Sequence, residues 1–154
     1  MMKKRMIVWM VAFAFVLSMA SLTFAQEKAK VPTWQTTPVK EWVAKAKAAI
    51  TKVSAADVKA AIDKKENAVF LDVRDPNEYG AGHLPASINV SRGLLEFNIW
   101  DKVSDKNGKI YVYCKTGGRA ALATKTLNDL GYKNAVLMDA LFEDWIKAGY
   151  PVER

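Results

Sequence analysis

Apolar side chains recur at helical spacing in the segment that begins at residue 39. Val39, Trp42, Val43, Ala46 and Ile50 fall at i, i+3, i+4, i+7 and i+11. At 3.6 residues per turn, these positions share one face of a helix. The pattern therefore predicts an amphipathic helix that buries this face, and it places the tryptophan in the core.

A second helix is predicted directly after Ser54. Serine is a favoured residue at the start of a helix, and Asp57 follows three residues on, in the first turn. Val58, Ala61 and Ile62 then lie on one face of the predicted helix. We expect that face to pack against the rest of the domain.

Four short apolar runs are typical of buried β-strands. The predicted strands are residues 68–73, 87–90, 110–113 and 135–138. Helical patterns separate or follow them at residues 93–100, 119–131 and 141–149, the last of which places Trp145 in the core. This alternation predicts an α/β fold, in which helices cover both faces of a parallel sheet. In such sheets the ligand site lies outside the carboxyl ends of the strands.

The first 25 residues differ in composition from the rest of the chain. A basic start is followed by an apolar run and by small residues that end at Ala25. This layout is typical of a bacterial secretory signal peptide (residues 1–25), with cleavage expected after Ala25 and Ala20 as a second position. An uncleaved anchor is the alternative, but the unbroken run 7–17 is too short to span a bilayer alone. We expect a periplasmic or secreted protein without a stable membrane anchor.

Residues 26–38 contain two prolines and no apolar periodicity, which predicts a flexible N-terminal segment. Residues 39–154 have the length of one domain. Removing the signal peptide lowers the formal net charge from +7 to +4, and the remaining excess is spread over lysines of the helical segments. This distribution favours solvated helix faces over a nucleic-acid site, because no basic cluster is interleaved with aromatic residues.

Candidate chemistry centres on the only cysteine, Cys114, which stands directly after the predicted strand 110–113. The only histidine is His83, and no group of His, Cys and carboxylates has metal-ligand spacing, so we expect no metal and no cofactor. In an exported protein a single cysteine has no internal disulfide partner, which raises the question of a free thiol. The alternative is that Cys114 is a small buried hydrophobe.

A loop with two glycines follows the cysteine and leads into a predicted helix. Gly117 and Gly118 can adopt the positive φ values that such a turn needs. Its amides would stabilise an anion or the Cys114 thiolate, while Lys115 and Arg119 add positive charge. The Arg119 fork could also hold an oxyanion by two hydrogen bonds. We expect an activated nucleophile that faces an anionic substrate. The predicted substrate-binding residues are Lys115, Thr116, Gly117, Gly118 and Arg119.

Three ordered motifs make the chain similar to the single-domain rhodaneses, a sulfurtransferase family. They are "LDVRDPNEYGAGHLPASINV" at 71–90, the loop "CKTGGRA" at 114–120 and the closing segment from Trp145 to Val152. The resemblance covers residues 54–152 and, with the signal peptide, identifies an exported bacterial member. It implies a rhodanese-like three-layer fold, with a five-stranded parallel sheet between helices.

The resemblance also implies a two-step sulfur transfer. The Cys114 thiolate attacks the sulfane sulfur of thiosulfate or a similar donor, and the resulting persulfide passes that sulfur to cyanide or a thiol. The loop amides would cradle the persulfide, while Lys115 and Arg119 attract the donor. The implied partners are small-molecule donors and acceptors, or a thiol protein, and we expect the protein to act as a monomer.

The chain departs from the family pattern at three places. Lys115 stands where rhodanese loops commonly carry arginine, and lysine is a point charge without the guanidinium fork. Asp139-Ala140 replaces a frequent Gly-Gly before the last helix, so a negative charge could lie near that helix. Ala86 and Ser87 replace the usual Gly and Ala, and we interpret both changes as structural.

The sequence leaves open other functions that proteins of the same fold perform. Cysteine phosphatases have a loop one residue longer, Cys-x5-Arg, whereas the sixth residue after Cys114 is Ala120. The shorter loop favours sulfur over phosphate. A persulfide carrier or a redox thiol of the cell envelope would use the same cysteine with a protein partner. A non-catalytic binding module is a further class.

Several other side chains could have either a structural or a chemical role. Asp72 and Arg74 stand at the end of a predicted strand and could tune the loop, although such residues more often fix local turns. We interpret Glu78 as the partner of a nearby basic group. His83 is interpreted as structural, because sulfur transfer needs no base once the thiolate is formed. Trp100 is compatible with either the pocket entrance or the core.

Overall fold

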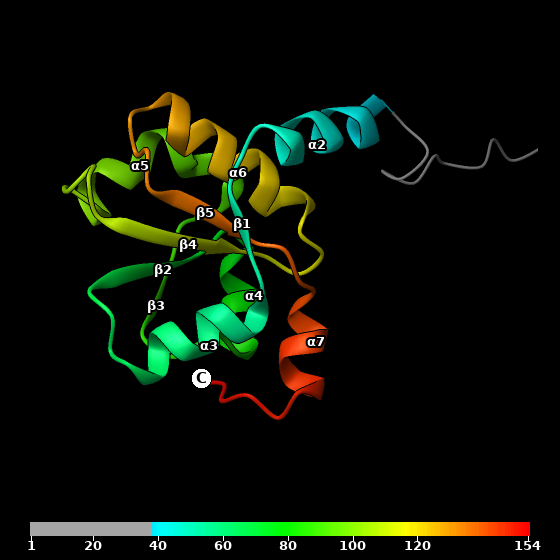
Figure 1. Ribbon diagram of the computed structural model, residues 1–154, viewed down its shortest axis with the longest axis vertical. Coiled ribbons are helices and arrows are strands. Elements are labelled where there is room, and N and C mark those ends of the chain that lie inside the picture. Colours follow the sequence, from blue (N-terminus) through cyan, green and yellow to red (C-terminus); the bar gives the residue numbers. More distant parts are fainter. Residues whose placement is uncertain (1–37) are drawn as a thin grey trace, which may run out of the picture. The chain divides into compact units, whose positions relative to one another are not determined.

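The computed structural model describes residues 38–154 of the chain (Figure 1). The predicted signal peptide, residues 1–25, lies outside these residues, as does all but the last residue of the predicted flexible segment. None of the helices in the described part has the length and apolar character needed to cross a bilayer.

Helices and strands alternate along the described chain, as the hydrophobic pattern predicts. The strands are β1 (Lys52–Val53), β2 (Ala68–Asp72), β3 (Ser87–Asn89), β4 (Lys109–Tyr113) and β5 (Ala135–Met138). The helices are α2 (Pro38–Ala48), α3 (Ala55–Asp63), α4 (Pro76–Ala81), α5 (Leu95–Lys102), α6 (Gly118–Asp129) and α7 (Phe142–Lys147). A 3-10 helix, η3 (Arg92–Leu94), leads directly into α5.

The five strands form one parallel sheet in the order β1-β5-β4-β2-β3. The prediction of an α/β fold with a five-stranded parallel sheet between helices is therefore confirmed. Strand β1 has no counterpart among the four apolar runs, because it contains only one apolar side chain. Its identity comes from pairing with β5, where Lys52 lies opposite Leu137 and Val53 opposite Met138.

Helix α4 is a second element that the hydrophobic pattern does not predict. Asp75-Pro76 suggests the end of a strand, but Pro76 occupies the first helical position, where its missing N–H leaves no hydrogen bond unmade. The Asp75 N–H donates to Glu78 Oε2 at 3.2 Å, which satisfies a backbone donor at the start of the helix. A helix this short contains no apolar periodicity from which the sequence could predict it.

Side chains of β4 divide between two cores, one on each face of the sheet. Ile110 and Val112 point into a core that α2, α5 and α6 cover, and Cys114 continues this series. Tyr111 and Tyr113 point into the other core, which α3 and α7 cover (Figure 1). Because side chains alternate along a strand, the thiol lies on the side of the sheet where α6 packs.

Helix α2 buries a narrower stripe than its sequence predicts. Val43 and Ala46 are buried, but Trp42 is 67% exposed and Val39 is 43% exposed. The prediction that Trp42 lies in the core is therefore wrong. The reason is that α2 packs mainly against one helix, α6, and a single helix partner covers only part of an apolar face.

Two other helix predictions are confirmed. Ser54 caps α3, because its Oγ accepts a hydrogen bond from the Asp57 N–H at 3.1 Å and its own N–H donates to Asp57 Oδ2 at 2.9 Å. Val58 is buried as expected. Trp145 is fully buried in α7, where its Nε1 donates to the Pro151 carbonyl at 2.9 Å.

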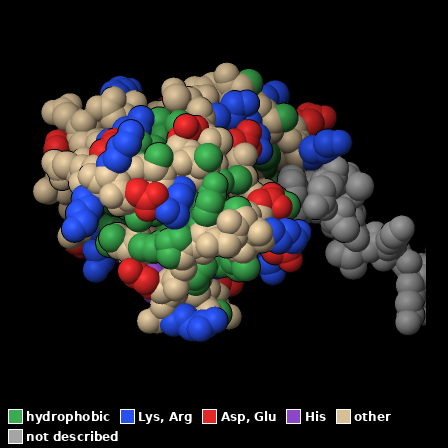
Figure 2. All heavy atoms as spheres, turned by 60° about the horizontal axis from the view of Figure 1, so that its bottom comes forward, with side chains coloured by type: hydrophobic (Ala, Val, Ile, Leu, Met, Phe, Trp, Pro, Cys, Tyr) green, Lys and Arg blue, Asp and Glu red, His purple; other side chains and the backbone are tan. Residues whose placement is uncertain are grey.

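Basic and acidic side chains are interspersed on the face that Figure 2 shows, with hydrophobic side chains between them. This view brings the lower side of Figure 1 forward, where α3, α7 and the C-terminal residues lie. On this face the excess positive charge forms no continuous basic patch, which agrees with its interpretation as part of solvated surfaces.

Ala86 adopts a backbone conformation that favours glycine. Its φ of +58° lies in the left-handed region, which costs a residue with a Cβ about 1–2 kcal/mol. Its N–H donates to Glu153 Oε2 at 3.1 Å, a hydrogen bond that glycine would keep. The departure from the usual glycine therefore leaves local strain in this turn.

We expect Ala86→Gly to stabilise the protein by about 0.5–1 kcal/mol, because relief of the strain exceeds the added entropy of the unfolded chain. The midpoint of urea unfolding, followed by circular dichroism, measures the change. Ala60→Gly, at an exposed position inside α3, is the matched control and should destabilise by about 1 kcal/mol. Equal destabilisation by both substitutions would contradict the strain at Ala86.

Candidate active site

Cys114 directly follows β4 and is 1% exposed. The loop that comes next curls around its sulfur, so that the Ala120 N–H, in the first turn of α6, donates to Sγ at 3.3 Å. A backbone donor at the start of a helix stabilises a negatively charged sulfur. The structure thus brings the thiol and the helix start together, as the sequence predicts for this loop.

Only one of the two loop glycines has the positive φ that the sequence suggests. Gly117 has φ +80° and precedes α6 as its N-cap residue. Gly118 is the first residue of α6 and does not have a left-handed conformation, so the expectation of positive φ is wrong there. One left-handed residue is sufficient to turn the chain from β4 into the helix.

The exposed part of the loop is tied to its neighbours through the backbone and one lysine. Lys115 and Thr116 are exposed, and the Lys115 carbonyl accepts a hydrogen bond from the Phe142 N–H at 3.1 Å, at the start of α7. Lys47 Nζ lies 3.5 Å from the position that a Cβ on Gly117 would occupy. The Lys47 ammonium is itself paired with the carboxylate of Asp139. Asp139 stands where the family frequently has a glycine, and it neutralises a lysine beside the loop.

Arg119 is held by carboxylates rather than directed at an open space. Its Nη1 and Nη2 donate to the two oxygens of Glu78 at 2.7 and 3.0 Å, and Nη1 lies 3.3 Å from Asp75 Oδ2. The interpretation of Glu78 as the partner of a basic group is confirmed. The hydrogen bond to Glu78 raises the pKa of Arg119, to which the nearby charge of Cys114 also contributes. The fork expected to hold an oxyanion is occupied by Glu78.

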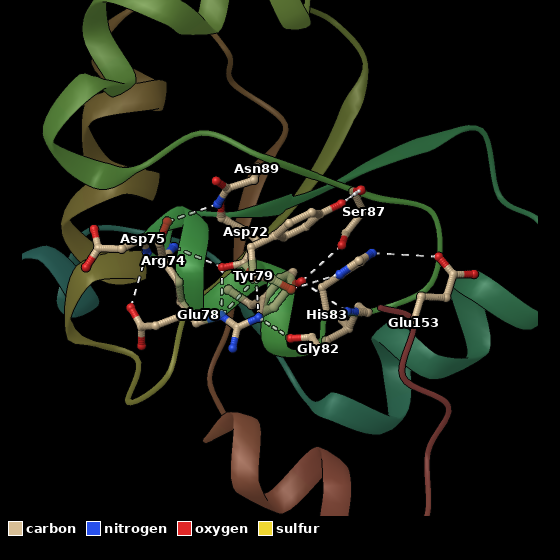
Figure 3. Close-up of polar contacts among 12 residues, drawn as sticks. Asp72, Arg74, Asp75, Glu78, Tyr79, Gly82, His83, Ser87, Asn89 and Glu153 are labelled. Carbon is tan, nitrogen blue, oxygen red and sulfur yellow. Dashed lines mark hydrogen bonds and ion pairs between the residues drawn. The ribbon is translucent and has the colours of Figure 1, made fainter.

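Asp72 and Arg74 form a buried ion pair at the end of β2 (Figure 3). Arg74 Nε and Nη2 donate to the Asp72 carboxylate at 2.6–3.0 Å, and Nη2 also donates to the Gly82 carbonyl at 2.7 Å. Burial works against the charged guanidinium, but Asp72 outweighs it and raises the pKa of Arg74. The Arg74 N–H also donates to Asp72, at 2.9 Å, so the pair fixes the turn after the strand, as expected.

His83 and Trp100 serve packing. The His83 ring stacks on Tyr79 at 3.8 Å between centroids, and its Nδ1 lies 3.0 Å from the Tyr79 carbonyl (Figure 3). The structural interpretation of His83 is therefore confirmed. Trp100 packs on Tyr132 and its Nε1 donates to the Glu96 carbonyl at 3.0 Å. Trp100 lines neither of the cavities beside the loop.

Two cavities flank residues 114–120, which we call the active loop. The first has a volume of about 200 Å³ and is lined by charged and aromatic groups: Arg74, Glu78, Ala81, Lys115, Phe142 and Glu143. The second has a volume of about 310 Å³ and a largely apolar wall: Val39, Val43, Thr116, Gly118, Arg119 and Leu122. Within residues 38–154 no group of three or more His, Cys, Asp or Glu side chains is arranged to hold a metal ion.

Sequence reasoning missed Phe142, Glu143 and Lys47 as neighbours of the loop. Phe142 and Glu143 open α7 and line the charged cavity, while Lys47 reaches the loop from α2. No spacing in the sequence relates these segments to Cys114. Only the packing of α2 and α7 around the carboxyl end of β4 brings them together.

Residues 54–148 match the family model of the rhodanese-like domain. The match covers more than half of the chain, and the chain belongs to the rhodanese-like domain family. The thiosulfate:glutathione sulfurtransferase of Saccharomyces cerevisiae is 34% identical in an alignment 105 residues long, which covers 60% of this chain and 76% of the yeast protein. The relatives of this rhodanese-like protein thus include sulfurtransferases.

Two solved structures extend the comparison. The polysulfide-sulfur transferase homodimer of Wolinella succinogenes is 29% identical, with a TM-score of 0.66 over 79% of this chain and 93% of that one. A Rhodopseudomonas palustris protein described as a possible tyrosine phosphatase is 31% identical, with a TM-score of 0.67 over 79% of this chain and 98% of its own. Both support the α/β fold.

The ion pair with Arg119 predicts a pH-dependent contribution from Glu78. The hydrogen bond from Arg119 lowers the pKa of Glu78 in the folded protein below its ordinary value of 4.5. The ionised carboxylate therefore stabilises the fold above that value, and this stability is lost as the pH falls through the depressed pKa. We expect Glu78→Gln to reduce stability at neutral pH by up to about 1 kcal/mol, and the difference to shrink in acid.

Urea unfolding of both proteins over a pH series measures this difference. Glu143→Gln is the control, because the Glu143 side chain is 70% exposed and its ion pair, with Lys147 at 3.5 Å, lies on the surface. It should change stability little at any pH. A Glu78→Gln difference that stays constant into acid would contradict the assigned role of the carboxylate.

Proposed function

We propose that this chain is a thiosulfate sulfurtransferase of the rhodanese type, and that Cys114 carries the sulfur as a persulfide. The observation that carries the proposal is the hydrogen bond from the Ala120 N–H to Sγ at 3.3 Å, at the start of α6. A donor in this position stabilises the negative charge of the persulfide that the first step leaves on Cys114. Lys115, exposed beside the thiol, supplies positive charge for an anionic donor.

The first half-reaction transfers one sulfur atom to the enzyme. The Cys114 thiolate attacks the outer sulfur of thiosulfate, a new S–S bond forms, and the bond between the two thiosulfate sulfurs breaks. Sulfite leaves with the electron pair of that bond. The product is an anionic Cys114 persulfide, so this step needs neither a proton nor an external redox partner.

The second half-reaction returns the enzyme to its starting state. Cyanide or a thiolate attacks the terminal sulfur of the persulfide, and the Cys114 thiolate leaves. The products are thiocyanate or a new persulfide on the acceptor. The yeast relative, whose name includes glutathione, supports a small thiol as an acceptor.

The length of the loop supports sulfur rather than phosphate as the transferred group. Arg119 is the fifth residue after Cys114, and its fork is bound by Glu78. A phosphatase loop would need that fork for the phosphate, and carboxylates beside it repel a phosphate dianion. We therefore place phosphatase activity behind sulfur transfer for this chain.

Residues 1–25 support a place of action in the periplasm or outside the cell. We propose that the protein acts there as a monomer on small-molecule donors and acceptors, with a thiol protein as the alternative acceptor. The proposal includes no metal, cofactor, nucleic acid or membrane anchor. Intact N-terminal residues on protein isolated from the cell envelope would contradict cleavage after Ala25.

We expect incubation with thiosulfate to add the mass of one sulfur atom to the protein, because the persulfide is a covalent intermediate. Cys114→Ser should abolish both this addition and the formation of thiocyanate from cyanide. Intact-protein mass spectrometry and a thiocyanate assay measure the two steps separately.

Two outcomes would contradict the catalytic role of Cys114: thiocyanate formation by Cys114→Ser at the parent rate, or no sulfur addition from any sulfane donor. Sulfur transfer that is faster to a protein thiol than to cyanide or glutathione would favour a carrier. Release of phosphate from an aryl phosphate would favour a phosphatase.

A further inference from the structure

Arg74 has a buried guanidinium, one nitrogen of which makes no hydrogen bond to residues 38–154. The residue is 4% exposed, and its Nε and Nη2 are fully engaged by Asp72 and the Gly82 carbonyl. Across residues 38–154 no acceptor binds Nη1, yet this nitrogen is not among the polar atoms sealed from solvent. In Figure 3 the guanidinium lies between Asp72 and Gly82, and the nitrogen without a dashed line is turned away from Asp72.

Arg74 lines the charged cavity beside the active loop. Arg74 and Lys115 both line this cavity of about 200 Å³, together with Phe142. The Phe142 ring lies 4.1 Å from the central guanidinium carbon, and its N–H donates to the Lys115 carbonyl at 3.1 Å. Phe142, at the start of α7, therefore contacts both basic residues that line this cavity.

The ion pair with Asp72 explains why Arg74 is buried, but it does not use Nη1. A guanidinium fixed by two other partners presents its remaining donors without further loss of side-chain entropy. Its low exposure also removes competing water, which strengthens a hydrogen bond to an anion. Such a preorganised donor suits the sulfonate oxygens of a sulfur donor.

We propose that Arg74 is a substrate-binding residue, whose Nη1 donates to the anionic group of the sulfur donor while Lys115 supplies a second cation. This inference rests on the proposed function and names the residues that select an anionic donor. Arg119, whose fork is bound by Glu78, then orders the loop rather than the donor.

Two carboxylates that line the same cavity allow a substitution whose expected effect on anion entry is opposite to that of removing Arg74. Glu78 and Glu143 also line the cavity, but Glu78 is paired with Arg119, whereas the Glu143 side chain is 70% exposed. Removing the charge of Glu143 should help an anion to enter, and removing Arg74 should hinder it.

Two alkylating reagents that differ by one carboxylate measure this selection. Iodoacetate and iodoacetamide both react with the Cys114 thiolate: an S–C bond forms, and iodide leaves with the electron pair of the C–I bond. We expect Arg74→Gln to lower the ratio of the iodoacetate rate to the iodoacetamide rate about ten-fold. Glu143→Gln should raise that ratio about two-fold. Equal slowing of both reagents by Arg74→Gln would overturn the proposal.

A measurement on the unsubstituted protein accompanies these variants, because Arg74→Gln breaks a buried ion pair. In the NMR spectrum of protein with isotope-labelled arginine, proximity to the Phe142 ring identifies the Arg74 side chain. Titration with sulfite should shift its signals saturably and leave those of Arg92, which is bound to Glu96 and Thr126, unchanged. No shift at Arg74, or equal shifts at both, would overturn the proposal even where the variant does not fold.

Neither measurement depends on sulfur transfer, so the two proposals fail separately. Absence of a persulfide with any donor would sink the proposed function. If the protein forms the persulfide but Arg74→Gln leaves the ratio of iodoacetate to iodoacetamide rates unchanged, only the role of Arg74 is contradicted.

Discussion

Five parallel strands end at the same edge of the sheet, and the site depends on that edge. Asp72 is the last residue of β2, Cys114 follows β4 and Asp139 follows β5. Because neighbouring strands are hydrogen-bonded in register, the chain turns that follow them must also lie side by side. The Asn89 side chain, at the end of β3, donates to the carbonyls of Asp72 and Arg74 at 3.0 and 2.9 Å, which joins two of these turns. Cys114 directly follows β4, which pairs with β2, so the sheet sets the position of the thiol beside these turns.

Charged side chains at this edge are largely paired with one another. Arg119 faces Glu78, Arg74 faces Asp72, and Lys47 faces Asp139. Ion pairs as exposed as that of Lys47 contribute little to stability, but they determine where each cation points. Lys115 has no carboxylate partner within the described residues. In the proposed function, recognition of the sulfur donor rests on single hydrogen-bond donors beside one cavity rather than on net charge.

The departures from the family pattern have local physical consequences. Asp139 neutralises Lys47, whose ammonium lies beside Gly117, and so links α2 to the active loop. Ala86 adopts a left-handed backbone conformation, and a glycine at this position would avoid its steric cost. Lys115 keeps a positive charge beside the thiol, but it lacks the guanidinium fork. In the structure, the guanidinium that lines the charged cavity together with Lys115 belongs to Arg74.

The sequence by itself determined the alternation along β4, the turn at Gly117 and the helix behind it, because these features depend on neighbouring residues. They place Cys114 at a strand end and, with the family resemblance, indicate its chemistry. Strand β1 and the exposure of Trp42 were not predictable from local pattern, because one depends on pairing with β5 and the other on how much of α2 finds a partner. Tertiary structure alone decided that Glu78 binds Arg119 and that Arg74 shares a cavity with the active loop. Charged side chains have many possible partners along the chain, and only the packing of distant segments selects one.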